Sequence, residues 1–372
     1  MANLHLSVSS HRFKRSPFFD RNDYPDTNYG IYNNRLYPLS SNLDQKAHYQ
    51  HLRSQCCLYD VPETPLRITG PDRIAFLNKL FTRDISKIKV GRAGYAIACN
   101  HEGGVLMDGV LMRPNDDVFI YVQANGDFLN WANAHAANFD VSIEDFDSWV
   151  LQIQGPTSLQ VLEAISDIDL TAFPYYAVGE IMINGNPFYV SRTGWTGERG
   201  FEIYSIGDGF DGGALWDYLL TKGQPAQLLA SNVSSMHIRR LEAGILDYGT
   251  DIDQRINPFE IGFGHFVDFK KPDFIGRTAL FATDQRRVRL LGLKTTEVTP
   301  VRGNALVDRY GEQIGTVTAG AWSPTLDSGI ALICLNRGVD ASEPIMIQQD
   351  QNQFSATLCA LPFYDPQKKL PR

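Results

Sequence analysis

The chain has 372 residues, of which 43% are hydrophobic and 20% charged, and its formal net charge is −8. This length exceeds one ordinary core, so two or three domains are expected, and the composition is that of a soluble globular protein. The negative charge argues against nonspecific binding to nucleic acid or to an anionic membrane. No stretch approaches the ~20 apolar residues that a membrane helix needs.

The cysteines indicate the redox compartment. Cys56, Cys57, Cys99, Cys334 and Cys359 form no CxxC motif, and the first two are adjacent. This odd, irregular set argues against a disulfide framework and against a zinc site. We therefore expect a cytoplasmic protein without a metal.

The N-terminal residues are basic. Arg12, Lys14 and Arg15 precede the first acid, Asp20, and no apolar core of a secretory signal accompanies them. Such a segment is compatible with a transit peptide or with an ordered arm. We expect the arm, over residues 1–43.

A helix and then a strand–turn–helix unit are predicted next. Tyr49, Leu52 and Cys56 recur at helical spacing, which predicts a helix over 44–58. A strand over 66–69 is followed by a Gly-Pro-Asp break that caps a second helix over 73–81.

The same order returns further along the chain. Residues 95–122 alternate around two glycines as a hairpin does, and a helix is predicted over 127–139. A strand over 149–154 then leads through another Gly-Pro pair into a helix over 157–165. Residues 66–80 and 151–165 thus repeat one pattern, which indicates an internal duplication and an α+β rather than a doubly wound fold.

The last part of the chain predicts a helix over 234–246 and then a β domain. Short strands separated by turn residues indicate a small antiparallel barrel or sandwich that begins near residue 285. The six predicted strands cover residues 290–293, 304–307, 313–319, 329–335, 345–348 and 355–361.

A glycine-rich loop is the first candidate binding element. Gly194, Gly197 and Gly200 bracket Trp195 and Glu198. An aromatic ring beside a carboxylate on a tight loop suits a flat heterocycle with N–H donors, such as a pterin, because the ring stacks and the carboxylate accepts hydrogen bonds. The same pattern fits an ordinary glycine-rich hairpin with a surface tryptophan.

Two further segments carry candidate chemistry. The hairpin turn is expected to place Asp108 at the start of the returning strand with Tyr95 across from it, where the acid either orients a substrate or caps a turn. On the helix over 234–246, Arg240 near Glu242 suits bidentate binding of a carboxylate, and equally a surface salt bridge.

Several stretches resemble the glycine-cleavage T-protein (aminomethyltransferase) family. RTGWTGERGFEIY at 192–204 resembles the family signature RTGYTGEDGFEI. Matching stretches keep the family order over roughly residues 44–335; they are NHEGGVLMDGVL at 100–111, LQIQGP at 151–156, RRLEAGILDYGTDID at 239–253, PDFIGRTAL at 272–280 and SPTLDSGIALI at 323–333.

The resemblance implies a three-domain, cloverleaf T-protein-like fold of the α+β class, with tetrahydrofolate in a central channel. Residues 1–43 would be an arm packed on the folate-binding body, 44–284 a folate-binding region of two similar α+β halves, and 285–372 a C-terminal antiparallel β-barrel. The positions that match the folate site are Tyr95, Asp108, Trp195, Glu202 and Arg240. The resemblance also moves the pterin-facing acid from Glu198 to Glu202.

Departures from the family pattern bear on the reaction. Met107 stands where T-proteins commonly carry the first of two acids, and residues 60–64 read DVPET instead of DVSHM. Trp195 replaces the usual Tyr. The stretches RSPFFDR, YGIYNNRLYP and NPFEIGFGHFV resemble the dimethylsulfoniopropionate demethylase branch of the family.

We therefore expect a tetrahydrofolate-dependent demethylase that moves a methyl group from a small donor, a sulfonium such as dimethylsulfoniopropionate, to give 5-methyltetrahydrofolate. Asp108 would be the catalytic residue that orients the substrate. Trp195 and Tyr204 would face the cation, and Arg240 would neutralise a carboxylate. The chain would be a monomer or homodimer.

Three alternatives stay open at this point. One is an aryl methyl ether O-demethylase, which would need a proton donor for its leaving phenolate. Another is a glycine-cleavage aminomethyltransferase. The third is a non-catalytic folate-binding protein, because fold alone is a poor guide to function.

Overall fold

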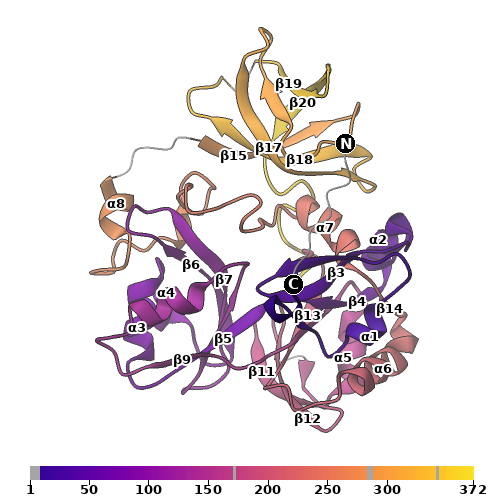
Figure 1. Cartoon of the computed structure of the whole chain (residues 1–372), viewed down its shortest axis with the longest axis vertical. Coiled ribbons are helices and arrows are strands. Elements are labelled where there is room, and N and C mark those ends of the chain that lie inside the picture. The colour runs from indigo at the N-terminus through magenta and orange to yellow at the C-terminus, as the bar shows by residue number, and fades with distance from the viewer. Residues whose placement is uncertain (1–8, 171–172, 283–287, 341–342) are drawn as a thin grey trace.

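The computed structural model describes residues 9–170, 173–282, 288–340 and 343–372. Its strands form a three-stranded sheet, a five-stranded sheet, a six-stranded sheet and a closed barrel (Figure 1). Helices and antiparallel strands are mixed rather than alternating in βαβ units, so the predicted α+β class is confirmed.

The first half of the body is built on the five-stranded sheet. Its strands, in spatial order, are β6 (Arg92–Cys99), β7 (Val105–Arg113), β8 (Phe119–Gln123), β5 (Thr64–Thr69) and β9 (Ser142–Asp145). The helices α3 (Arg73–Leu80) and α4 (Phe128–Ala134) pack on one face through a core that includes Phe76, Phe81 and Phe128.

The second half is built on the six-stranded sheet. Its strands, in spatial order, are β11 (Val178–Ile183), β12 (Asn186–Ser191), β13 (Gly200–Ser205), β10 (Val150–Gln154), β4 (Cys56–Val61) and β14 (Leu228–Ala230). The helices α5 (Ser158–Ile165) and α6 (Gly212–Gly223) pack on its outer face, where Trp216 and Phe188 join one core.

The two halves repeat one arrangement. In each, a strand (β5 or β10) runs through a Gly-Pro turn into a helix, and a three-stranded antiparallel meander (β6–β8 or β11–β13) lies beside that strand. Gly70 and Gly155 both have positive φ, 105° and 128°. A Cβ would lie 2.4 Å from the Asp140 carbonyl oxygen at Gly70 and 2.1 Å from that of Gln55 at Gly155. The turn therefore requires glycine in both copies, and the predicted duplication agrees with this arrangement.

The inner faces of the two sheets pack against each other. Met112 and Ile120 of the first sheet share one buried cluster with Tyr59, Val150 and Tyr204 of the second. The body is thus layered as helices, sheet, sheet and helices. The chain crosses between the sheets twice, at 62–63 between β4 and β5 and at 146–149 between β9 and β10.

The N-terminal segment packs on these crossings. It contains β1 (Lys14–Arg15), α1 (Phe19–Asn22), β2 (Asn28–Tyr32) and β3 (Arg35–Ser40). The guanidinium of Arg35 is buried and donates to the carbonyl oxygens of Glu63 at 2.7 Å and Ser148 at 2.6 Å, one in each crossing. It also lies 4.0 Å from the centroid of the Trp149 ring. One side chain of the arm thus joins both connections between the halves.

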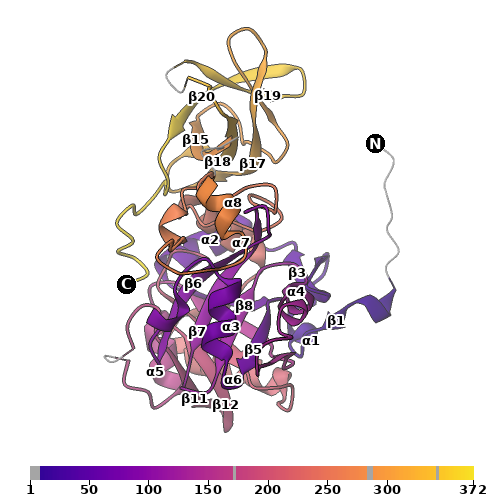
Figure 2. The same ribbon diagram turned by 90° about the vertical axis from the view of Figure 1, so that its left-hand side faces the viewer.

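The barrel lies at one end of the molecule (Figures 1 and 2). Its strands, in spatial order, are β15 (Val288–Thr295), β18 (Ser328–Asn336), β17 (Gln313–Ser323), β16 (Ala305–Val307), β19 (Ile345–Gln349) and β20 (Asn352–Cys359). All six predicted strands are present, so the predicted barrel is confirmed. The predicted boundary at residues 284 and 285 lies outside the described residues.

Two helices and the C-terminal segment connect the barrel with the second half. Helix α7 (Val233–Glu242) lies beneath the barrel, contacts β17 and packs on α2 (Gln45–Ser54), whereas α8 (Arg277–Ala282) precedes the barrel. The C-terminal segment then returns past α7, where the Tyr364 amide donates to the Glu242 carbonyl at 3.0 Å. Among the described residues, no helix has the length and apolar character to cross a membrane.

Three helix predictions were too long. The helix expected over 44–58 ends at Ser54, because residues 56–61 form the fully buried strand β4 between β10 and β14. The helix expected over 127–139 is α4, which ends at Ala134. The helix expected over 234–246 is α7, which ends at Glu242 because Gly244 takes a positive φ of 64°.

Arg35 generates a stability prediction. Lysine cannot reach both carbonyl oxygens and stack on Trp149, so Arg35→Lys is expected to lower the free energy of unfolding by about 2–4 kcal/mol. Urea denaturation measures this change. Arg15→Lys, at an exposed position of the same arm, is the control and should change stability by less than ~0.5 kcal/mol. An equal effect of both substitutions would contradict the role assigned to Arg35.

Candidate active site

A cavity of about 400 Å³ lies between the two halves, α7 and the segment that follows it. This volume is within the range of small-molecule sites in proteins. Its aromatic lining residues are Tyr32, Tyr37, Tyr95, Tyr175, Tyr176, Trp195, Tyr248, Phe263, Phe266 and Tyr364. Its carboxyl groups are Glu63, Asp108, Glu198, Glu202, Asp247 and Asp365.

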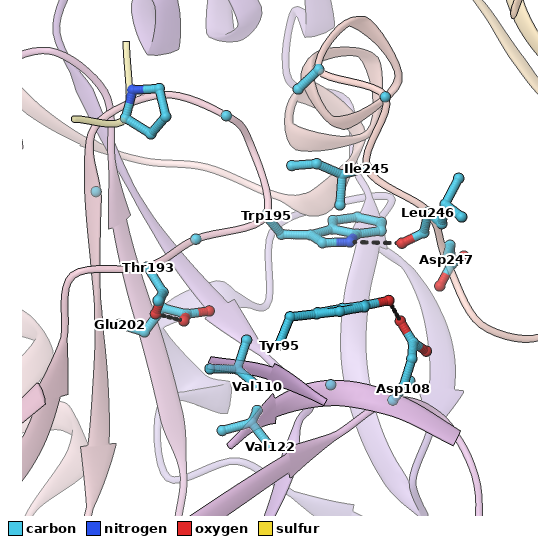
Figure 3. A pocket seen from close by; sticks show the side chains of 18 of the residues that line it. Tyr95, Asp108, Val110, Val122, Thr193, Trp195, Glu202, Ile245, Leu246 and Asp247 are labelled. Carbon is cyan, nitrogen blue, oxygen red and sulfur yellow. Dashed lines mark hydrogen bonds between the residues drawn. The ribbon is translucent and has the colours of Figure 1, made fainter. Parts of the chain in front are cut away.

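The hairpin of β6 and β7 brings Tyr95 and Asp108 together. In its register Ile97 lies opposite Asp108, so Tyr95, two residues earlier, faces the same side of the sheet. The Tyr95 hydroxyl donates a hydrogen bond to Oδ2 of Asp108 (Figure 3). Oδ1 of Asp108 is buried and has no hydrogen-bond partner in the described part of the chain. Burial raises the pKa of Asp108 to about 6, against the lowering effect of the Tyr95 hydrogen bond.

Trp195 lies across the cavity on the glycine-rich loop between β12 and β13. In the view of Figure 3 its ring lies above that of Tyr95, and its Nε1 donates to the Leu246 carbonyl at 3.4 Å. Gly197 in this loop has a φ of 67°, and a Cβ there would lie 2.5 Å from the Cβ of Ala243. The loop therefore passes so close to the end of α7 that only glycine fits.

Glu202 faces the cavity from β13, at the end opposite Asp108 in the view of Figure 3. Its carboxylate accepts hydrogen bonds from Gln152 Nε2 at 2.7 Å, from the Tyr204 hydroxyl at 2.9 Å and from the Thr193 hydroxyl. Burial raises its pKa, and the hydroxyl donors oppose that shift. The carboxylate is thus oriented by neighbours and available to accept further N–H groups.

Glu198, the first acid that the loop suggested, has a different environment. Its carboxylate accepts from Nη1 of Arg53 and from Nε of Arg239 at 2.7 Å. This acid is neutralised by two guanidinium groups, whereas Glu202 has only uncharged donors.

Two predicted positions are not on the cavity wall. Arg240 is fully buried, pairs with Asp251 at 2.5 Å and donates to the Ile245 carbonyl at 3.1 Å. Its guanidinium lies 5.2 Å from the centroid of the Trp195 ring and makes a cation–π contact with it. Tyr204 is also fully buried and points its hydroxyl at Glu202. The expected contacts of Arg240 with a ligand carboxylate and of Tyr204 with a cationic donor are therefore absent from this geometry.

Several wall residues were not predicted. Tyr32 and Tyr37 come from the arm, Glu63 from the first crossing, and Arg239 and Lys368 from α7 and the C-terminal segment. Tyr32, Tyr37 and Glu63 lie in stretches that depart from the T-protein pattern, and Arg239 lies in the RRLEAG motif, but none of the four was singled out. The Oε2 of Glu63 lacks a hydrogen-bond partner in the ranges the structure describes. Burial, and then the nearby Glu202, raise its pKa to about 8.

These residues fit tetrahydrofolate. The buried, unpartnered oxygens of Asp108 and Glu63 are acceptors that a ligand with N–H donors can satisfy. Trp195 and Tyr95 supply faces for a flat ring, and Glu202 supplies an oriented carboxylate. Among the described residues, no cluster of His, Cys, Asp and Glu side chains has the arrangement of a metal site.

Comparison with known proteins identifies the family. Residues 22–271 match the GCVT N-terminal domain, and residues 286–365 match the glycine cleavage T-protein C-terminal barrel domain. The aminomethyltransferase of Thermotoga neapolitana is 33% identical over 308 residues, which is 80% of this chain and 83% of the relative. The aminomethyltransferase of Saccharopolyspora erythraea is 33% identical over 331 residues, 86% of this chain and 89% of the relative.

The fold comparison is equally extensive. The crystal structure of glycine cleavage system aminomethyltransferase T from Bartonella henselae superimposes with a TM-score of 0.85 at 24% identity, covering 94% of this chain and 98% of that one. The expected T-protein-like fold is therefore confirmed. With both domain matches and the identities to full-length relatives, the chain belongs to the glycine cleavage T-protein family, whose aminomethyltransferases use tetrahydrofolate as cosubstrate.

Proposed function

We propose that this chain transfers an aminomethyl group from a small donor to tetrahydrofolate bound in the central cavity. The observation that carries the proposal is Asp108, a buried carboxyl on the cavity wall with one unpartnered oxygen and a pKa raised to about 6. The aminomethyltransferase relatives support this reaction over methyl transfer.

Binding follows from the two sides of the cavity. Trp195 and Tyr95 would hold the pterin between aromatic faces, and Glu202 would accept its N–H groups. When bound, tetrahydrofolate supplies the nitrogen that accepts the one-carbon unit.

Asp108 supplies the proton chemistry. As the methylene bridge forms, the two reacting nitrogens of tetrahydrofolate lose one proton each, and the bonds from the donor carbon to its amine and to its thiol sulfur break. One proton leaves with ammonia and the other with the thiol, and Oδ1 of Asp108 would carry the proton that goes to the amine. The hydrogen bond from Tyr95 to Oδ2 fixes the carboxylate plane and leaves Oδ1 for this exchange. A pKa of about 6 suits both accepting and donating a proton, because the carboxyl group is then a moderate base and a moderate acid near neutral pH.

Methyl transfer from a sulfonium or quaternary ammonium donor is the second candidate. Aromatic rings with carboxylates attract an organic cation, and on the cavity wall Tyr32 lies close enough to Glu63, Asp247 and Asp108 to interact with all three. This supports the sulfonium-dependent demethylation expected from the sequence, with dimethylsulfoniopropionate as one such donor.

The substitution at Met107 does not help to choose between the two reactions. Its side chain is 2% exposed and packs in the core of the first half, away from the cavity wall. The cavity therefore keeps its set of acids whether residue 107 is methionine or aspartate.

Product analysis separates the two candidates. The purified protein is incubated with tetrahydrofolate in two parallel sets of reactions. One set contains an aminomethylated dihydrolipoyl donor, and the other contains methylated sulfonium or ammonium donors. Aminomethyl transfer yields 5,10-methylenetetrahydrofolate and ammonia, whereas methyl transfer yields 5-methyltetrahydrofolate without ammonia. Mass spectrometry of the folates scores both, and formation of 5-methyltetrahydrofolate alone would refute the proposal.

Asp108→Asn tests the proton role. The amide keeps the shape of the side chain but cannot accept a proton, so kcat should fall by about 10²-fold or more, whereas the tetrahydrofolate Kd should change by less than about 3-fold. Steady-state kinetics and titration calorimetry measure the two quantities. Equal losses of turnover and binding would assign Asp108 a structural role instead.

The raised pKa of Asp108 also predicts a pH profile. Because the ionised carboxylate is the active form, kcat/KM should decline as the pH falls through about 6 and should be flat just above it. The residual activity of Asp108→Asn should lack this acid limb. If that variant keeps a limb with the same apparent pKa, another group controls the reaction.

A further inference from the structure

The barrel lies outside the cavity but contacts a segment that forms part of its wall. Among the described residues of the barrel, from β15 to β20, none lines the cavity. The barrel closes around a core of its own. Residues 244–248 are on the wall, and two barrel side chains donate hydrogen bonds to the stretch 249–251 that follows them. Any effect of the barrel on the site therefore passes through such contacts.

Asp251 is the residue at which these contacts meet. It is only 2% exposed. Its Oδ2 accepts from Nη1 of Arg240 at 2.5 Å and from the Asp247 amide at 2.9 Å. Its Oδ1 accepts from the Thr318 hydroxyl, on β17 of the barrel, at 2.6 Å. One buried carboxylate thus joins α7, the wall segment and the barrel.

The Trp195 ring is held by two of the groups that Asp251 anchors. The Arg240 guanidinium lies 5.2 Å from the ring centroid, and its Nη1 also donates to the Ile245 carbonyl at 3.1 Å. On the other side, Trp195 Nε1 donates to the Leu246 carbonyl at 3.4 Å (Figure 3). The position of the ring therefore depends on α7 and on the wall segment together.

The barrel side of this connection is itself well fixed. The Thr318 oxygen also lies 3.1 Å from the Leu332 carbonyl of the neighbouring strand β18. A hydroxyl carries one hydrogen, so the shorter contact, with Asp251, identifies its acceptor. A second barrel residue, Arg302, donates through Nη2 to the Gly249 carbonyl at 3.0 Å. The wall segment is thus bound to the barrel at two points.

A ring that is ordered before the ligand arrives binds more tightly. If the ring is free to move, the ligand must order it on binding, and the affinity falls by the fraction of molecules that have the binding geometry. The contacts of Asp251 are all made within the chain. They therefore order the ring in the free protein.

We infer that Asp251 is a positioning residue through which Thr318 of the barrel holds the Trp195 ring in the orientation that stacks on the pterin. The inference rests on the proposed function, because it takes Trp195 as one face of the folate site. It gives the barrel a role in folate affinity without any contact between the barrel and the ligand.

Thr318→Val tests this role. Valine keeps the shape of the side chain but removes the hydroxyl, which leaves Oδ1 of Asp251 without its donor. The tetrahydrofolate Kd, measured by titration calorimetry, should rise about 3- to 10-fold. Thr318→Ser keeps the hydroxyl and should stay within about 2-fold of the unsubstituted protein.

Thr316→Val is the matched control. Thr316 lies on the same strand, two residues earlier, and is not among the hydrogen-bond partners of Asp251 in the described structure. This substitution makes the same chemical change in the barrel and should leave the tetrahydrofolate Kd unchanged.

A double-mutant cycle with Trp195→Ala separates positioning from a general structural effect. Trp195→Ala removes the ring and itself weakens binding. Because Thr318 acts through this ring, adding Thr318→Val should then change the Kd by less than about 1.5-fold. A general structural effect would instead weaken binding equally in both backgrounds.

Arg302→Met gives an independent test at an exposed position. It removes the second link from the barrel and should raise the Kd about 2-fold, again only while Trp195 is present. Arg302 also interacts with the charge of Asp247, but an effect through that charge would persist in the Trp195→Ala background.

Additive effects in the two backgrounds, or equal effects of Thr318→Val and Thr316→Val, would overturn the inference and leave aminomethyl transfer untouched. Coupled effects on the Kd in a protein that transfers no aminomethyl group would refute the proposed function alone.

Discussion

The position of the cavity depends on how the two crossings of the chain are held together. The buried guanidinium of Arg35 donates to a carbonyl in each crossing, at Glu63 and at Ser148, and stacks on Trp149. Each half alone is a sheet with helices on one face, and its site residues lie at the edge of the interface between sheets. Relative displacement of the halves would separate Asp108 on one from Glu202 on the other. The N-terminal arm is therefore part of the site, since it holds the crossings and adds Tyr32 and Tyr37 to the wall.

Ionisable groups divide the cavity into two chemically different regions. Glu198 and Glu242 form ion pairs with arginines, whereas Asp108 and Glu63 form no ion pair within the described ranges and have raised pKa values. Burial without pairing makes such carboxyl groups exchange protons near neutral pH. A ligand with N–H donors can satisfy the buried oxygens of Asp108 and Glu63 that have no partner among the described residues.

Much of the fold could be predicted from local sequence patterns. The Gly-Pro breaks, the hairpin that brings Tyr95 to Asp108 and the six barrel strands depend on turn chemistry and alternation, which are visible in sequence. The family resemblance identified Trp195 and Glu202 as folate-site positions, and both lie on the cavity wall. Helix ends were missed because tertiary context decides them: residues 56–61 are strand because a buried sheet position receives them. That Arg239 and not Arg240 lies on the wall was not predictable, because the rotation of α7 about its axis depends on tertiary packing, here that of Arg240 against Asp251 and Trp195.

A crystal structure of the protein with tetrahydrofolate bound tests the central claim most directly. The account predicts the pterin between Trp195 and Tyr95, with its N–H groups on Glu202 and Oδ1 of Asp108 facing the reactive side of the ring. A folate bound outside this cavity, or with its glutamyl group directed towards Asp108, would contradict it.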